Sequence, residues 1–150
     1  MNTAIDRDHD RDHDRDHDRG HDRVYDYDHD REYDYDGRSF RPAGADPGES
    51  GRSARYHQDG DLLRGEFSGG DTRQGVLAGV CGPDGTLDFA YCMVLTDGQV
   101  VVGRCHSTPS RLPDGRIRLH ERWERYGAHA ASGISWLEEA VPDAPAGAAS

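Results

Sequence analysis

The feature that most constrains the fold is a series of short runs between residues 85 and 139 in which apolar and polar side chains alternate. Leu-Asp-Phe-Ala-Tyr at 87–91 and Ile-Arg-Leu-His-Glu-Arg-Trp at 117–123 both alternate, and Asp-Gly pairs stand at 97–98 and 114–115. Alternation with a period of two is typical of half-buried strands, and Asp-Gly is a favoured hairpin turn. This stretch therefore predicts an antiparallel meander.

The same pattern extends towards the N-terminus, and no helical stripe of useful length interrupts it. Eight strands that close on themselves would just enclose side chains or one small ligand. We expect an all-β, calycin-like fold, an antiparallel meander of about eight strands that forms a small barrel or half-barrel behind a disordered N-terminal tail. The expected strands are about 38–42, 53–58, 62–68, 74–81, 86–95, 99–107, 115–126 and 133–140.

Composition divides the chain into a tail at 1–32, a small all-β domain at 33–141 and a disordered C-terminus at 142–150. The first 36 residues hold 14 acidic residues and six arginines, so they carry −8 of the formal net charge of −11. A four-residue Asp-Arg-Asp-His repeat fills 6–23. With almost no apolar content, this tail cannot offset the entropic cost of ordering.

Histidines in the tail are weak candidates for metal binding. His9, His13, His17 and His21 recur every four residues with aspartates between them. Imidazole and carboxylate suit zinc, nickel or copper, but aspartate is a poor helix former, so we expect at most weak divalent metal binding by the tail. Expansion of a repeated DNA unit would produce the same pattern without selection for function.

Charge and composition exclude several classes of function. An acidic chain does not attract nucleic acid or an anionic membrane, and no apolar run approaches the ~20 residues of a membrane span. All 18 basic residues are arginine, which excludes a Schiff-base or P-loop lysine. No secretory signal is visible, and three widely spaced cysteines fit reduced thiols in a cytoplasmic protein. No cofactor is expected.

Glu121 is the residue that the alternation singles out, because it shares an inward face with Ile117, Leu119 and Trp123. A buried carboxylate needs a partner, and Arg104 on the preceding strand is the candidate. Such a pair would fix strand register, or it would orient a polar ligand. In the second case Arg104 and Glu121 anchor the ligand, and Tyr91 and Trp123 form the walls of its site.

The remaining core expectations follow from the same alternation. Val100 and Val102 are expected to face inward together with Arg104, and the strand at 74–81 is expected to be covered on both sides. Trp123 and Trp136 are expected in the core rather than at the rim. Cys105 is expected to be a buried thiol and not a nucleophile, because its neighbour His106 faces the opposite side of the strand.

Several motifs resemble those of a largely bacterial family of small proteins of about 110 residues, whose members are often labelled N-acetylglutamate synthase. The resemblance covers 35–139, and it implies a small β fold and acetyl transfer from coenzyme A. This chain departs from the family pattern at Arg125, where many members carry a second tryptophan. The motifs that carry the resemblance are Tyr-Asp-Gly at 35–37, Tyr-His-Gln-Asp-Gly at 56–60, Gly-Val-Leu-Ala-Gly at 75–79, Gly-Arg-Cys-His-Ser-Thr-Pro at 103–109, Glu-Arg-Trp at 121–123 and Ser-Gly-Ile-Ser at 132–135.

Three functions remain open at this point. The residues favour a small soluble β-barrel module that binds a small ligand without catalysis. The resemblance implies instead an acyl-CoA-dependent N-acetyltransferase, although the chain lacks the Gly-rich strand–turn–helix unit that holds a pyrophosphate. The third is an interaction protein whose core is filled by its own side chains. A cavity separates the first from the third, and binding of coenzyme A separates the second from both.

Overall fold

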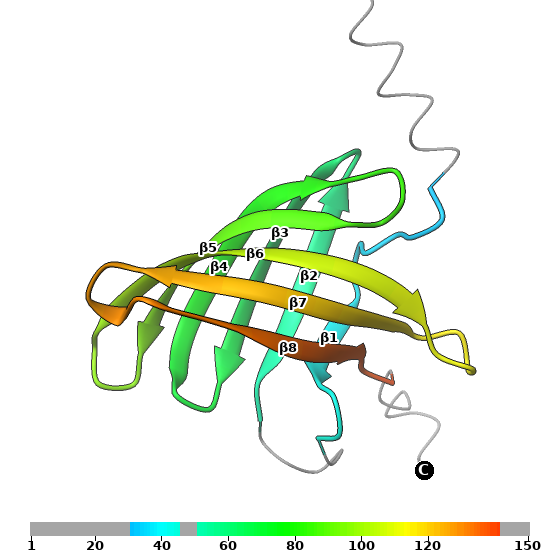
Figure 1. Ribbon diagram of the computed structural model, residues 1–150. Helices are drawn as coiled ribbons and strands as arrows, with labels where there is room; N and C mark the ends of the chain where they lie inside the picture. The colour runs from blue at the N-terminus through cyan, green and yellow to red at the C-terminus, as the bar shows by residue number, and fades with distance from the viewer. Residues whose placement is uncertain (1–30, 46–50, 142–150) are drawn as a thin grey trace, which may run out of the picture.

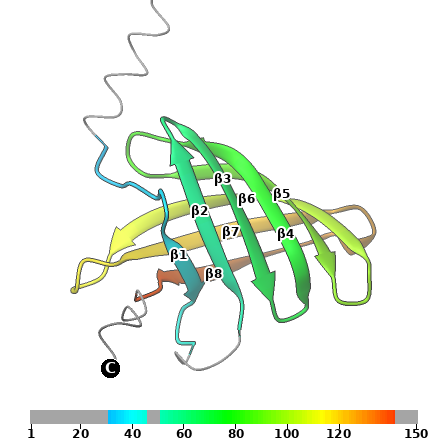
Figure 2. The same cartoon turned by 180° about the vertical axis from the view of Figure 1, so that it is seen from behind.

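The chain forms one closed antiparallel barrel whose strands follow one another in chain order (Figures 1 and 2). The computed structural model describes residues 31–45 and 51–141; the histidine repeat and the segment 142–150 lie outside them. The described residues also include a 3₁₀ turn, η1 (Gly127–His129), between the last two strands. The strands are β1 (Ser39–Pro42), β2 (Ser53–Asp59), β3 (Leu62–Gly69), β4 (Thr72–Cys81), β5 (Leu87–Leu95), β6 (Val100–Arg111), β7 (Ile117–Tyr126) and β8 (Ala131–Glu139).

Closure depends on the short strand β1, which pairs with β2 on one side and with β8 on the other. Phe40 stands opposite Ala54 of β2 and Glu139 of β8. The other strands pair with their neighbours in sequence through tight turns, and glycines with positive φ stand at 60, 70, 85, 98 and 115. The prediction of a meander of about eight strands that forms a barrel is confirmed.

The face that β6 turns inward differs from the prediction. Val101, Gly103 and Cys105 are buried, whereas Val100 and Val102 are 60% and 46% exposed. A run of three valines carries no alternation, so its sequence cannot set the phase of the strand. A one-residue error in phase moves every side chain to the other face.

Two further core expectations are wrong for related reasons. The strand β4 is covered on one side only, because Val76 and Val80 are about half exposed on the outside of the barrel. Trp136 is 42% exposed, and its ring lies between the Arg118 guanidinium and the His120 imidazole, both on the outer face of β7. Closure of the sheet into one barrel leaves no second layer to cover these side chains.

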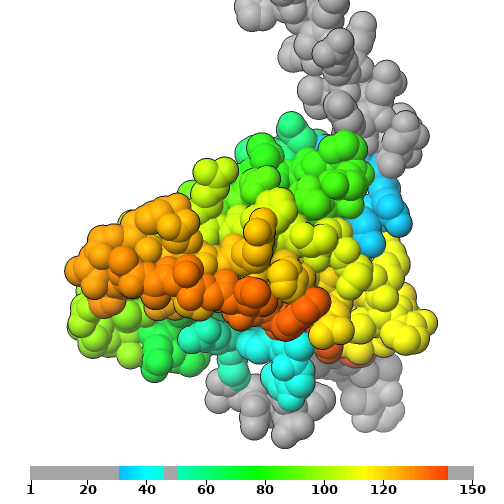
Figure 3. All heavy atoms as spheres, in the orientation of Figure 1, coloured from blue at the N-terminus to red at the C-terminus, as the bar shows by residue number. Residues whose placement is uncertain are grey.

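The segment before β1 closes one end of the barrel. Tyr35 is fully buried, and its hydroxyl donates a 2.6 Å hydrogen bond to the carbonyl oxygen of Gly85 in the β4–β5 turn. Arg111 of β6 packs its guanidinium on the Tyr33 ring and donates to the carbonyl of Glu32, so this segment lies beside the β6–β7 turn (Figure 3). Behind this plug the core is filled by Phe40, Tyr56, Leu63, Leu87, Ile117 and Leu119.

Inward-facing glycines make room for aromatic rings throughout the barrel. Five of them stand directly opposite an aromatic residue of a neighbouring strand. A Cβ atom on Gly133 would lie 2.5 Å from the Trp123 ring, and one on Gly75 would lie 2.3 Å from the Phe67 ring. The large rings thus lie flat against the wall. The five pairs are Tyr56–Gly65, Phe67–Gly75, Phe89–Gly79, Tyr91–Gly103 and Trp123–Gly133.

Replacement of Tyr35 by phenylalanine is expected to lower the free energy of unfolding by about 1–2 kcal/mol, because the buried carbonyl of Gly85 loses its hydrogen bond. Burial raises the pKa of the Tyr35 phenol, so the donor stays protonated. Urea unfolding of the full chain measures the change. Tyr126→Phe is the matched control, since Tyr126 is 45% exposed. Equal stabilities of the two variants would contradict the role of Tyr35 in closing this end of the barrel.

Candidate functional site

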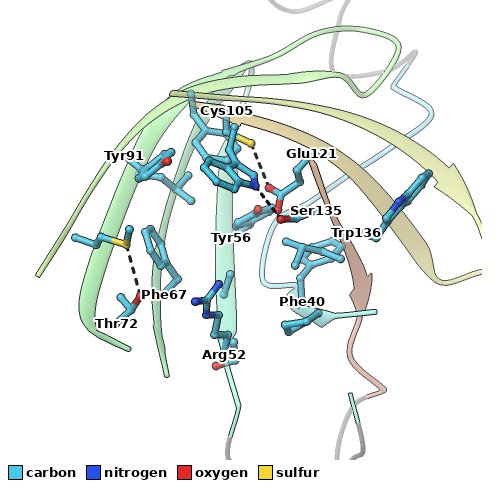
Figure 4. Close-up of a pocket in the computed structure, with 18 of the residues that line it drawn as sticks. Phe40, Arg52, Tyr56, Phe67, Thr72, Tyr91, Cys105, Glu121, Ser135 and Trp136 are labelled. Atoms are coloured by element: carbon cyan, nitrogen blue, oxygen red, sulfur yellow. Dashed lines mark hydrogen bonds between the residues drawn. The ribbon is translucent and has the colours of Figure 1, made fainter. Parts of the chain in front are cut away.

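A cavity of about 240 Å³ lies inside the barrel, between the filled end and the opposite rim (Figure 4). Its lining is largely apolar and aromatic, and side chains from most of the strands contribute. The residues that carry its chemistry are Arg52, Tyr56, Phe67, Tyr91, Met93, Cys105, Glu121, Trp123, Arg125 and Ser135. The closed end is packed, so the cavity opens at the rim that holds the β3–β4 and β7–β8 turns.

A polar row that runs across three strands lies at the inner end of the cavity, with Glu121 and Ser135 in the lining and Ser107 buried behind them. Strand register places Ser107 of β6 opposite Glu121 of β7, and Glu121 opposite Ser135 of β8. The Ser107 hydroxyl and the Cys105 thiol each donate to Oε2 of Glu121, both at 3.4 Å. No cationic group contacts this carboxylate within the described ranges.

Burial raises the pKa of the Glu121 carboxyl, and the hydrogen bonds from Cys105 and Ser107 offset only part of the rise. The thiol of Cys105 has a raised pKa, chiefly through burial and then through the charge of Glu121. The pKa of the Tyr56 phenol is also raised, by burial and then by the charge of Glu121. A carboxylate is therefore held among neutral hydroxyl and thiol groups, where desolvation is costly and only partly compensated.

Glu121 is expected to make the barrel less stable as the pH rises. A pKa that is higher in the folded state than in the unfolded chain contributes stability below the unfolded value, near 4.5, and loses it as the pH rises through the folded value. Urea unfolding of the wild type and of Glu121→Gln at several pH values isolates this contribution. The free energy of unfolding of the glutamine variant, relative to that of the wild type, should increase as the pH rises. A difference that stays constant with pH would contradict the raised pKa.

Aromatic rings form the walls above the polar row. The indole nitrogen of Trp123 donates a 3.0 Å hydrogen bond to the Ser135 hydroxyl, which fixes the ring against Gly133 (Figure 4). Tyr91 and Phe67 meet edge to face, with ring centroids 6.2 Å apart. Tyr91 and Trp123 thus line the cavity, and their role as walls of a ligand site stays a prediction.

Two arginines stand at the open end. Arg52 comes immediately before β2 and lies along Gly70 of the β3–β4 turn, and Arg125 faces inward from β7 opposite Gly103. The Arg125 guanidinium packs over the Trp123 ring at 5.2 Å. Neither arginine was expected in the site from the sequence. The signal for Arg125 was available in its even spacing from Glu121 and Trp123.

Arg104 does not belong to this site, and its expected pairing with Glu121 is wrong. It lies on the outer face of β6, opposite Glu124 of β7, because the true phase of β6 turns Gly103 and Cys105 inward. It lines a shallow surface depression together with His106 and Arg122. Of the four predicted anchors and walls, the structure brings together Glu121, Tyr91 and Trp123.

The cysteines show no arrangement for nucleophilic catalysis. Cys81, Cys92 and Cys105 are free, and Cys105 and His106 lie on opposite faces of β6, as predicted. His106 pairs instead with Asp88 on the outer surface, at 2.7 Å. No cluster of three potential metal ligands occurs among the described residues, and none of their helices is long and apolar enough to cross a bilayer.

Comparison with known proteins identifies the family. The family described as avidin-like protein matches residues 33–140, which include every strand of the barrel and every residue of the cavity. The chain belongs to this avidin-like family, whose small β-barrel is that of a non-catalytic module for small ligands. No curated protein and no solved structure matches the chain. The family match carries no information on the label N-acetylglutamate synthase.

Proposed function

We propose that the protein binds one small organic ligand inside the barrel, with the ligand's polar group at Glu121 and its apolar body between Trp123, Tyr91 and Phe67. The observation that carries this proposal is the cavity that ends on a desolvated carboxylate without a cationic partner in the described part of the chain. An apolar pocket with a few convergent polar groups is the usual form of a small-ligand site.

The chemistry of the inner end selects the ligand's polar group. The Glu121 carboxylate accepts hydrogen bonds, and so does the free lone pair of the Ser135 hydroxyl, which also lines the cavity. A ligand group with one or two N–H donors, such as an amide, a urea or an aromatic amine, complements this set. Donation to the carboxylate would also lower the desolvation cost that Glu121 carries in the empty barrel.

An interaction protein with a filled core is the competing interpretation. Packing supports it only at the closed end, where Tyr35, Leu63 and Leu119 leave no space. At the other end Phe67, Tyr91 and Trp123 remain half-buried, with faces directed into the cavity. Half-exposed aromatic walls inside a barrel favour an occupant from outside the chain.

Fluorescence titration with N-phenyl-1-naphthylamine tests the proposal. This uncharged amine has two aromatic units and one N–H donor, and its emission rises when it leaves water. We expect saturable binding of one molecule per chain. Absence of binding would contradict the proposal, and displacement of the dye by acetyl-coenzyme A would favour the acetyltransferase.

Biotin is the first natural compound to test by displacement. Its cyclic urea carries one N–H donor on each side of its carbonyl group, and either N–H can donate to a carboxylate acceptor. Displacement of the dye would place the natural ligand in the class of cyclic ureas. Failure of biotin to displace a dye that does bind would exclude that compound and leave the cavity site in place.

A further inference from the structure

The charges that line the cavity are divided between its two ends. Glu121 is the acid of the lining and lies at the inner end, whereas the bases Arg52 and Arg125 lie at the open end. Residues 37–150 carry 15 acidic residues and 12 arginines, a net charge of −3. Two inward-directed guanidinium groups at one rim of a negatively charged domain thus form a local positive site.

Arg125 is held in a position that leaves part of its hydrogen-bonding capacity unused. Its Nε atom is buried and has no hydrogen-bond partner among the described residues. Burial raises the pKa of the neighbouring Tyr91 phenol, and the Arg125 guanidinium offsets part of that rise, so the two groups lie close together. A buried N–H donor without a partner is costly, and an incoming acceptor removes the cost.

Because Gly103 stands opposite Arg125, no side chain from β6 competes for this space. A Cβ atom on Gly103 would lie 2.4 Å from the Tyr91 hydroxyl oxygen. The glycine therefore lets the Tyr91 ring lie against β6 beneath the guanidinium. The Trp123 ring supports the guanidinium from the same strand. Aromatic rings that flank an arginine leave its N–H edge free to bind an anion in a bidentate manner.

We infer that the cavity takes an amphiphilic anion, with a carboxylate, sulfonate or phosphate group bound at the rim by Arg125, assisted by Arg52, and with its apolar body inside the barrel. This inference rests on the proposed function and adds the charge of the ligand and its orientation. Arg125 acts as a specificity-determining residue, because its guanidinium selects an anionic group at the rim.

A matched pair of dyes tests the inference. 1-Anilinonaphthalene-8-sulfonate has the skeleton of N-phenyl-1-naphthylamine with one added sulfonate, so the two differ by a single anionic group. Arg125→Met should weaken binding of the sulfonate about tenfold more than it weakens binding of the uncharged dye, the size of one charge-assisted hydrogen bond. Arg125→Lys should retain most of the affinity for the sulfonate.

Two further variants distinguish a direct effect of the rim arginines from the effect of the protein's overall charge. Arg122→Met removes the same charge from the outer face of the same strand and should leave the affinities for both dyes unchanged. Arg52→Met, at an exposed position, should weaken the sulfonate alone by about threefold and gives a second test if Arg125→Met does not fold. Added salt should weaken the sulfonate and not the amine.

The outcomes distinguish the two proposals. If neither dye binds the wild type, the proposed function fails. If both dyes bind and Arg125→Met changes their affinities to the same extent, the cavity site stands and the anion site at the rim is overturned. The inference predicts that Arg125→Met selectively lowers the affinity for the sulfonate dye and that Arg122→Met has no effect.

Discussion

Replacement of Gly79 by alanine is expected to destabilise the barrel by about 3 kcal/mol, at the upper end of the usual cost of overpacking. An ideal Cβ atom at this position would lie 2.0 Å from the carbonyl oxygen of Asp88 and 2.5 Å from the Cα of Phe89. Both are backbone atoms of β5, held by the antiparallel ladder between β4 and β5. Relief therefore requires the two strands to separate, which breaks hydrogen bonds on both sides of the site.

Urea unfolding followed by circular dichroism measures this loss, and Gly75→Ala on the same strand is the matched comparison. The Cβ atom of that variant would meet the end of the Phe67 side chain, at 2.3 Å, and a ring can rotate where a backbone cannot. We expect Gly75→Ala to cost clearly less stability than Gly79→Ala, and to alter ligand binding, because Phe67 lines the cavity. Equal losses in the two variants would show that contact with the β5 backbone does not determine the cost.

Introduction of tryptophan at position 54 is expected to abolish ligand binding, with a loss of affinity of about 100-fold or more for N-phenyl-1-naphthylamine. Ala54 faces the cavity from β2, between Phe40 and Phe67 in the strand register. An indole ring there would take the space that the ligand needs. The position is only partly buried, so the barrel can accept the larger side chain without repacking its closed end.

Ala78→Trp is the control for that change, since it places the same indole on the exposed outer face of β4. Dye titration and urea unfolding of both variants separate the two effects. We expect Ala78→Trp to bind the dye as the wild type does. If Ala54→Trp folds and still binds with unchanged affinity, the dye occupies some site other than the barrel interior.

Alternation and turn chemistry were sufficient to predict the strands, because the strands from β2 to β7 are joined by tight hairpin turns and each has one buried face. Leu87, Phe89 and Met93 on β5, and Ile117 and Leu119 on β7, are buried as their alternation predicts. The inward orientation of Glu121 followed from the same phase on β7. Local sequence thus carries both the strand and its inner face where apolar and polar residues strictly alternate.

The error at Arg104 has a specific physical origin. The valines at 100–102 precede residues whose inner face holds small side chains, Gly103, Cys105 and Ser107, so hydrophobicity alone favours the wrong phase. The inner face is small because the rings of Tyr91 and Trp123 come from the flanking strands and take up the space. The fit of small side chains on β6 to large rings on β5 and β7 depends on which residues pair across the strands, and a single sequence does not reveal that pairing.

The most direct test of the central claim, that a small ligand enters the barrel, uses the methionine methyl groups as reporters. The chain has two methionines, Met1 and Met93, and Met93 is buried in the wall of the cavity beside Thr72. With ¹³C-methyl methionine, titration of N-phenyl-1-naphthylamine should shift the Met93 signal in step with the dye's fluorescence and leave Met1 unchanged. A rise in fluorescence with an unchanged Met93 signal would contradict the claim, since the dye would then lie on the exposed apolar surface outside the barrel.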